Sequence, residues 1–389
     1  MAHTIKGNYI NGSWQQGKSL KTQKIINPAN LTEVVGYVQW ADSKTVKLAL
    51  GSANIAMIAW RKTSIENRVR YANLLLDNIA KHTLEFTHII TSENGKTTKE
   101  SLSEVNASIE ESKFQINFLR SNLKEIAGKT EIRYEPLGVV LTITPWNFPL
   151  ATIMRKMIPA IVSGNSVIVK PSEYAPLTSI LLFELIHEIG FPNGVVNLIN
   201  GIGEEIGPAL LQSGFIKAIS FTGSNSTGNK IAKQIGGKDI RFQAEMGGSN
   251  AVVVLKDANL DIVVPDIISN AFACGGQWCT GTSRVIAENG IYGKLMENLK
   301  QYTAKITVGN GIDKHVDMGP VSNERQFNSI KRIIKKAKKQ GAKTEMGETM
   351  DKPVPLQGYQ VAPTILSHIT SEMDIAEEEV FGPVLMVYK

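Results

Sequence analysis

The sequence predicts an α/β fold in which a parallel sheet is covered by helices on both faces, followed by a second α/β domain. Short apolar runs separated by Pro and Gly begin near residue 139, and longer helical patterns lie between them. Strands that read as continuous apolar runs are typical of parallel sheets, because crossover helices bury both faces of such a sheet. The alternation of the two patterns therefore indicates the fold class.

Each expected element follows from its local pattern. Residues 41–127 are rich in helix formers, with apolar positions repeating at three and four, which predicts a helical region. Residues 177–189 predict a further helix, because the pattern ends at Gly190 and Pro192 follows. A second strand-and-helix series places a domain boundary near residue 247. The expected strands are residues 139–144, 166–170, 195–199, 218–221 and 251–255.

Composition limits the class of protein. A chain of 389 residues is expected to divide into two or three domains. Its two cysteines, Cys274 and Cys279, are too few for a disulfide framework. The sequence shows neither a long apolar run nor the apolar core of a signal peptide. We therefore expect a cytoplasmic protein with free thiols and no membrane partner.

The basic residues gather in residues 331–339, although the net charge of the chain is only +6. Ile330, Ile333, Ile334 and Ala337 recur there at helical spacing, so the lysines form the solvated side of an amphipathic helix. Binding of nucleic acid is the alternative, but the sequence has no aromatic interleaving and no zinc pattern. We expect no nucleic-acid partner and no metal site.

Cys279 is a candidate nucleophile. It follows Gly276, Gln277 and Trp278 in a small turn, and the carboxylate of Glu245 is encoded upstream as a candidate base. The alternative interpretation is that the cysteine is a small apolar core residue.

A candidate phosphate-binding turn follows the strand at residues 218–221. Gly223 lets backbone approach a phosphate, and Ser224 precedes a helix whose unpaired N–H groups favour an anion. The alternative is an ordinary turn with Ser224 as helix cap. Residues 201–207 depart from the dinucleotide spacing and carry two acids, so we interpret them as a structural turn.

Two other loops carry chemistry. Lys170 and Glu173, after another strand, could bind the two hydroxyls of an adenosine ribose, although an ion pair of little energetic worth is the default for such a couple. Pro145 and Pro149 fix the backbone around Asn147, whose amide would then be a preorganised donor to a carbonyl oxygen that gains negative charge. The alternative for that loop is a hydrogen-bonded turn.

Taken together, these motifs resemble those of the aldehyde dehydrogenase superfamily, the NAD(P)-dependent enzymes that oxidise aldehydes through a cysteine thioester. The motifs occur in the family's order and cover the chain almost end to end. They are residues 145–149, 170–173, 221–224, 245–248, 276–279 with Arg284, and 379–383. The resemblance implies a Rossmann-like nucleotide-binding domain over residues 1–122 and 137–247, an oligomerisation hairpin at 123–136 and a catalytic domain over 248–389.

The resemblance also implies catalytic roles. Cys279 would attack the aldehyde carbon as thiolate, and the side chain of Asn147 with the backbone N–H of Cys279 would stabilise the oxyanion. Glu245 would activate the water that hydrolyses the thioester, and it could also help to deprotonate Cys279. Lys156 matches a lysine that the family keeps close to the active site.

For the cofactor, the resemblance implies NAD. Lys170 and Glu173 would contact the adenosine ribose, Ser224 the pyrophosphate, and Glu379 with Phe381 the nicotinamide ribose. Glu173 would repel the 2′-phosphate of NADP whereas Lys170 would attract it, so NAD is favoured and NADP stays an alternative. The implied cofactor-binding residues are Thr144, Pro145, Trp146, Lys170, Ser172, Glu173, Gly223, Ser224, Glu245, Gly247, Glu379 and Phe381.

Arg155 suggests the substrate. Semialdehyde oxidisers of this family often carry Arg-Lys here, and an arginine in a cleft can hold a carboxylate with two hydrogen bonds. The hypothesis is a short polar aldehyde or semialdehyde; the alternative is an arginine paired with a structural carboxylate. The implied substrate-binding residues are Asn147, Arg155, Trp278 and Thr280.

The end of the sequence departs from the family. Relatives continue past the Phe-Gly-Pro motif, whereas this sequence ends at Lys389. We expect a short catalytic domain with exposed apolar surface, and a dimer or tetramer weakened accordingly. Two competing functions stay open: a cysteine-dependent ester hydrolase, and a truncated cofactor-binding protein without turnover.

Overall fold

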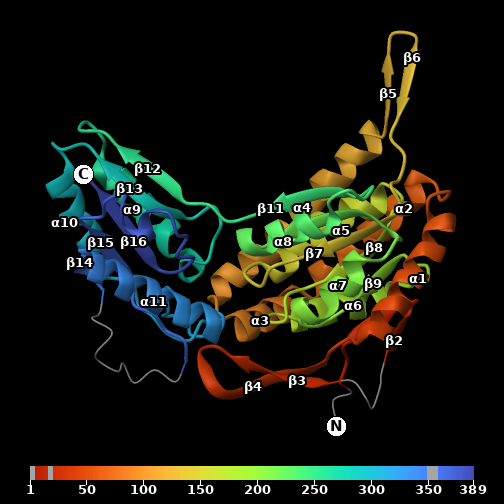
Figure 1. The fold of residues 1–389 in the computed structure, drawn as a ribbon, viewed down its shortest axis with the longest axis horizontal. Helices are drawn as coiled ribbons and strands as arrows, with labels where there is room; N and C mark the ends of the chain where they lie inside the picture. Colours follow the sequence, from red (N-terminus) through yellow and green to blue (C-terminus); the bar gives the residue numbers. More distant parts are fainter. Residues whose placement is uncertain (1–4, 16–20, 348–357) are drawn as a thin grey trace. The chain divides into compact units, whose positions relative to one another are not determined.

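The computed structural model describes residues 5–15, 21–347 and 358–389, and it divides into two units (Figure 1). Unit 1 comprises Met1–Ile25, Val35–Ile90 and Ser101–Met246, and unit 2 comprises Ile26–Val34, Thr91–Glu100 and Gly247–Lys389. The two units divide after Met246, and the boundary expected from the sequence is near residue 247. The segments Ile26–Val34 and Thr91–Glu100, which the predicted boundaries assign to the nucleotide-binding domain, group with unit 2 instead. Local periodicity cannot reveal such an exchange, because it depends on contacts distant in sequence.

Unit 1 is built on a seven-stranded sheet in the order β11-β10-β7-β8-β9-β1-β2. The five strands from β11 to β9 run parallel, and β1 and β2 add an antiparallel edge. Their bounds are β1 Asn8–Ile10, β2 Ser13–Gln15, β7 Val139–Ile143, β8 Ser166–Lys170, β9 Val196–Leu198, β10 Ile216–Thr222 and β11 Arg241–Glu245. The predicted α/β fold is confirmed.

Helices cover both faces of this sheet. Successive side chains of a strand point to opposite faces, and in β8 Val167 and Val169 belong to one apolar core whereas Ile168 belongs to another. The first core includes side chains of α2 (Ile65–Lys81), α5 (Pro149–Val162) and α6 (Leu177–Ile189). The second includes side chains of α1 (Ser43–Trp60), α7 (Gly203–Leu211) and α8 (Asn225–Ile235). Helix α6 has the predicted bounds and ends at Gly190, whose φ of 71° is left-handed.

The predicted helical region contains four helices, α1, α2, α3 (Thr83–Asn94) and α4 (Thr98–Asn122). A two-stranded hairpin follows α4 and comprises β5 (Lys124–Ala127) and β6 (Thr130–Arg133), within the residues predicted for a hairpin (Figure 1). A second two-stranded sheet comprises β3 (Thr22–Asn27) and β4 (Asn30–Gln39). None of β1 to β4 is predicted from the sequence: β1 and β2 have only three residues each, β3 carries mostly polar residues, and β4 mixes polar and apolar residues without a long apolar run.

Unit 2 is built on a five-stranded sheet in the order β12-β13-β16-β15-β14. Its strands are β12 Asn250–Val254, β13 Thr282–Ala287, β14 Lys343–Met346, β15 Thr364–Ser367 and β16 Val384–Tyr388. One face packs on α9 (Leu260–Phe272) and α10 (Tyr292–Thr303). The other face packs on α11 (Glu324–Gln340). Two short 3₁₀ helices complete the unit, η1 (Ala273–Gly276) and η2 (Asp374–Ala376).

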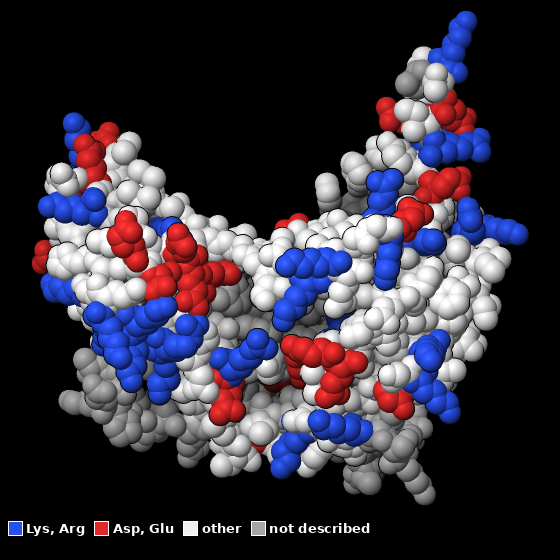
Figure 2. All heavy atoms as spheres, viewed as in Figure 1, with Lys and Arg blue, Asp and Glu red and all other residues white. Residues whose placement is uncertain are grey.

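Helix α11 is amphipathic as predicted. Ile330, Ile333, Ile334 and Ala337 are buried, and basic side chains gather on the opposite, solvated side (Figure 2). Two of these cations pair with carboxylates of unit 2: Arg332 with Glu378, and Lys336 with Asp374. In the described part of the chain, no helix has both the length and the apolar character needed to cross a bilayer.

Candidate active site

Cys279 lies in a turn between η1 and β13, with its side chain exposed, whereas Cys274 is buried. The backbone before it is unusual: Cys274, Gly275 and Gly276 have φ values of 53°, 63° and 68°. Left-handed residues cost conformational energy unless they are glycine, so two of the three are glycines. The exposed position argues against the interpretation of Cys279 as an apolar core residue.

Hydrogen bonds hold this turn on both sides of Cys279. The buried Gln277 donates from Nε2 to the carbonyl of Cys274 (2.8 Å) and accepts from the N–H of Ser322 (2.9 Å). Asn250 on β12 donates to the carbonyls of Cys279 (2.8 Å) and Gly281 (2.9 Å). Close backbone packing adds to these bonds, because a Cβ on Gly276 would lie 2.1 Å from the carbonyl oxygen of Gly382. The thiol is therefore carried by a fixed turn.

A small pocket of unit 2 brings together three of the predicted residues, Trp278, Glu379 and Phe381. Burial raises the pKa of Glu379, and the backbone N–H of Gly248 opposes that shift. The loop of Gly247 passes close to this carboxylate, because a Cβ on Gly247 would lie 1.9 Å from Glu379 Oε2. Only glycine fits at Gly247 while Glu379 keeps this position.

In unit 1, predicted cofactor residues lie at the carboxyl ends of neighbouring strands. Thr144 follows β7 and donates its N–H to the carbonyl of Lys170 at the end of β8 (3.1 Å). Lys170 is buried; its Nζ donates to the carbonyl of Pro171 (2.9 Å) and lies 3.6 Å from Glu173 Oε2. Burial lowers the pKa of Lys170, and the carboxylates of Glu173 and Glu204 oppose that shift. A surface ion pair, the default interpretation of this couple, is therefore wrong for the lysine.

The turn after β10 leads into α8. Ser224 caps the helix: its Oγ accepts from the N–H of Thr227 at 3.3 Å and donates to the Thr227 hydroxyl at 3.0 Å. Gly223 donates its N–H to the carbonyl of Glu245 (3.1 Å), and a Cβ at this position would lie 2.8 Å from the ring of Phe221. Residues 201–207 form a turn and the start of α7, in line with the structural interpretation.

These groups fit a dinucleotide. Among the described residues, the Oγ1 of Thr144 is buried without a hydrogen-bond partner, as expected for a group that binds a ligand. Thr144 follows β7, and Lys170 ends the neighbouring strand β8. On the other side of β7 lies β10, which leads to the N-terminus of α8 and its N–H groups. Ligands of open parallel sheets bind at this edge.

Asn147 and Lys156 flank the start of α5. Asn147 is buried, and α5 begins at Pro149 with no cap from its own N-cap side chain. The buried Glu104 of α4 replaces that cap, because its Oε1 accepts from the N–H groups of Leu150 (2.9 Å) and Ala151 (3.1 Å). No local sequence pattern links Glu104 to α5, so its role as a cap cannot be predicted from the sequence.

Lys156 points from α5 to the polar side chains of β10 and β11. Its Nζ donates to Ser220 Oγ (2.9 Å) and lies 3.4 Å from Gln243 Oε1, and Gln243 Nε2 donates to Glu245 Oε1 (2.8 Å). Burial lowers the pKa of Lys156 to about 8, although the Glu245 carboxylate opposes the shift. The structure thus brings together Lys156 and Glu245, and it adds Ser220 and Gln243, which lie outside every sequence motif.

Arg155 points away from this group. Its Nε and Nη2 donate to the two carboxylate oxygens of Glu111 on α4, at 2.9 and 2.8 Å, and both side chains are about half exposed. This geometry matches a structural ion pair, the alternative left open for Arg155.

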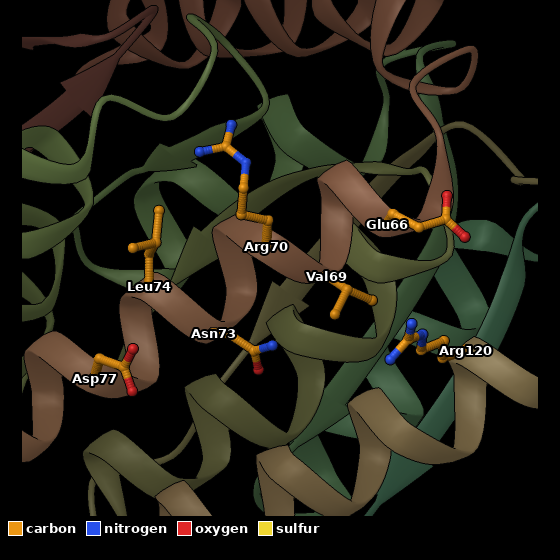
Figure 3. Close-up of a pocket in the computed structure, with 7 residues that line it drawn as sticks. All are labelled: Glu66, Val69, Arg70, Asn73, Leu74, Asp77 and Arg120. Atoms are coloured by element: carbon orange, nitrogen blue, oxygen red, sulfur yellow. The ribbon is translucent and has the colours of Figure 1, made fainter.

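A surface pocket of about 310 Å³ lies elsewhere in unit 1, between α2 and α4 (Figure 3). Glu66, Arg70, Asp77 and Arg120 contribute charged groups of both signs, and Val69 and Leu74 contribute apolar ones. None of the predicted site residues lines it, so the pocket plays no part in the candidate site.

The remaining predicted residues divide between the units. Pro145 and Trp146 belong to the loop of Asn147 in unit 1, and Ser172 Oγ accepts from the N–H of Tyr174 (3.3 Å) in the loop after β8. Thr280 follows Cys279 in unit 2. Their ligand contacts stay predictions.

Comparison with known proteins gives consistent results. The family model described as the aldehyde dehydrogenase family matches residues 14–389. The alpha-ketoglutaric semialdehyde dehydrogenase of Bacillus subtilis (strain 168) is 36% identical over 389 residues, which cover 98% of this chain and 80% of that protein. The malonate-semialdehyde dehydrogenase 2 of Bacillus anthracis is 37% identical over 396 residues, which cover 99% and 80%.

Solved structures agree with these relatives. A betaine aldehyde dehydrogenase from Staphylococcus aureus, in complex with NAD⁺, has a TM-score of 0.95 and 32% identity, and the match covers 99% of this chain and 78% of that chain. An aldehyde dehydrogenase C mutant from Pseudomonas syringae, with NAD⁺ and octanal, has a TM-score of 0.95 and 33% identity over 100% and 80%. The family predicted from the motifs is confirmed: the chain belongs to the aldehyde dehydrogenase family.

Proposed function

We propose that this chain oxidises a semialdehyde to the dicarboxylic acid with NAD⁺, through a covalent adduct on Cys279. One observation carries the proposal: an exposed thiol on a fixed, glycine-rich turn, in a chain of the aldehyde dehydrogenase family. The substrate class is supported by relatives whose names specify semialdehydes, including the two Bacillus enzymes above.

The first half of the reaction assigns roles to two residues. The Cys279 thiolate adds to the aldehyde carbon and forms a C–S bond. The amide of Asn147 and the backbone N–H of Cys279 donate to the oxygen that becomes negative. NAD⁺ would supply the hydride acceptor when bound. Loss of hydride from the adduct carbon leaves a thioester on Cys279.

The second half hydrolyses that thioester. Water adds to the thioester carbon while Glu245 accepts a proton from it. The C–S bond then breaks, the acid leaves, and Cys279 regains its thiolate. Lys156 contributes a nearby positive charge to Glu245 through the contacts described above.

We propose NAD in preference to NADP. The Lys170 ammonium already has a carboxylate, Glu173, at 3.6 Å, and Glu204 adds a second negative field. A 2′-phosphate would therefore meet carboxylates rather than an uncompensated cation. Replacing Glu173 with Gln should raise the ratio of kcat/KM for NADP to that for NAD by about tenfold.

We also propose a homo-oligomer that works in the cytoplasm. The hairpin β5–β6 exposes apolar side chains: Ile126 is 70% exposed and Ile132 is 38% exposed. Exposed apolar surface of this kind favours association with another chain. The two free thiols favour a reducing compartment. Light scattering after gel filtration would test the oligomer, with Ile126→Lys as the variant expected to reduce the mass.

Absorbance at the NADH band tests the proposed function. The protein is mixed with NAD⁺ or NADP⁺ and a panel of succinate semialdehyde, malonate semialdehyde, propanal and octanal. Turnover that needs both NAD⁺ and a semialdehyde supports the proposal. Cleavage of an aryl ester without NAD⁺, and no oxidation, would support the hydrolase instead. Binding of NAD⁺ without turnover of any aldehyde would support the cofactor-binding alternative.

A further inference from the structure

Gln243 lies between the two charged residues of the Lys156 group, on the edge strand β11. Side chains of β11 alternate between the two faces of the sheet: Phe242 and Ala244 pack into the core of α1, α7 and α8, so Gln243 and Glu245 share the opposite face. Ser220 of β10 lies on that same face, directly opposite Gln243 in the parallel register. Strand periodicity thus places Ser220, Gln243 and Glu245 on one face of the sheet. Lys156 of α5 contacts this row.

The orientation of the Gln243 amide is set by charge. Its Oε1 accepts from the Ser220 hydroxyl at 2.5 Å and lies 3.4 Å from the Lys156 ammonium, and its Nε2 donates to Glu245 Oε1 at 2.8 Å. The reverse orientation would place the NH₂ group against the ammonium and the carbonyl against the carboxylate. Both contacts would then be repulsive. Lys156 therefore determines that the NH₂ end of the Gln243 amide faces Glu245.

We propose that Gln243 is the positioning residue of Glu245: it holds the carboxylate by one oxygen and leaves the other oxygen for the water. This inference rests on the proposed function of Glu245 in thioester hydrolysis. An amide cannot pass a proton along this row, since its N–H groups do not dissociate near neutral pH. Gln243 therefore acts through orientation, and its buried anchor is Lys156, which is 7% exposed.

The position of the hydrogen bond determines which step it affects. Addition of the thiol and loss of hydride do not need Glu245 in this scheme, whereas hydrolysis does. Loss of the Gln243 contact should therefore slow release of the acid and leave the first turnover intact. A general structural defect would lower both.

Gln243→Leu removes both ends of the amide while keeping a similar size. We expect kcat with a semialdehyde to fall about tenfold, as for one lost charge-assisted hydrogen bond. The rapid NADH burst of the first turnover should keep an amplitude near one per active site, and the KM for NAD⁺ should stay within about twofold. Arg241→Leu, the same replacement two residues earlier on the same face of β11, is the matched control and should behave like wild type.

Two further variants keep the inference testable if Gln243→Leu does not fold. Ser220→Ala removes one of the two partners of Oε1 and should lower kcat about threefold, with the burst intact. Gln243→Glu places a second carboxylate beside Glu245 and should move the acid limb of the kcat profile to higher pH.

The outcomes are distinct. A Gln243→Leu enzyme with kcat within twofold of wild type, or with burst and kcat falling in parallel, would overturn the positioning role. A wild-type enzyme without any NAD⁺-dependent oxidation would overturn the proposed function instead, and the variants would not be needed to see it.

Discussion

The two units hold their predicted site residues by different means. In unit 1, Lys170 and Thr144 lie at the carboxyl ends of parallel strands, where sheet topology itself places them. In unit 2, the segment that leads to Cys279 contains three successive residues with positive φ, Cys274 to Gly276, and it depends on backbone packing between Gly276 and Gly382. The difference teaches that sheet topology positions the first site region, whereas local backbone conformation positions the second. Substitutions should expose this contrast.

The largest effect is expected from removing the thiol. Cys279→Ala should lower kcat by about ten-thousandfold, because the covalent step has no other nucleophile. NAD⁺ affinity, measured by calorimetry, should change less than twofold, since the residues proposed for the adenosine half belong to unit 1. Retention of even 1% of the turnover would argue for a different nucleophile.

The second largest effect is expected from Gly276→Ala. The added methyl group meets the Gly382 carbonyl, at 2.1 Å, and a φ of 68° disfavours any side chain. The free energy of unfolding should fall by about 2–4 kcal/mol, measured in urea. The control is Gly51→Ala in α1, where the methyl group meets open space and a gain of about 0.5–1 kcal/mol is expected. Equal effects at both glycines would erase the contrast between the units.

A smaller, pH-dependent effect is expected from Lys156→Met. The pKa of Lys156 is lowered from 10.5 to about 8 by burial, so between these values the unfolded chain binds the extra proton. The wild-type free energy of unfolding should thus rise with pH across this window, and the burial penalty is fully present below pH 8. In the variant, the free energy of unfolding should rise by about 1–3 kcal/mol less than in the wild type across this pH window, after allowance for solvent screening. Parallel curves for the two proteins would contradict the assignment.

The smallest effect is expected from Arg155→Leu. An exposed ion pair with Glu111 is worth about 0–1 kcal/mol, so stability should change little. The KM values for succinate semialdehyde and propanal should shift together and by less than about twofold. A rise confined to the semialdehyde would restore Arg155 as a substrate ligand.

Much of the fold could be predicted from the sequence. The apolar runs at β7, β8 and β10 and the helix α6 follow from periodicity, because most of their side chains are buried. Strand β11 was not predicted, since its residues alternate between exposed and half-buried and only two of them, Phe242 and Ala244, pack on the core. The exchange of Ile26–Val34 between units was likewise invisible to a local pattern.

The site could be predicted where motifs carry it. Local patterns make Cys279, Glu245 and Asn147 candidates, and the family resemblance adds Lys156 and the assigned roles. These roles stay predictions until the variants are measured. Gln243, Ser220 and Glu104 could not be found this way, because each acts on a partner brought near by folding. Burial of Lys170 was equally hidden, since the sequence shows a lysine and a carboxylate but not the solvent around them.

The contrast between the two cysteines offers a practical handle for spectroscopy. Because Cys274 is shielded and Cys279 is open, a maleimide dye should label the native protein once per chain, and a denatured sample should take up two dyes. An aldehyde analogue bound at Cys279 should block this labelling, so the loss of dye fluorescence would report how much of the site is occupied.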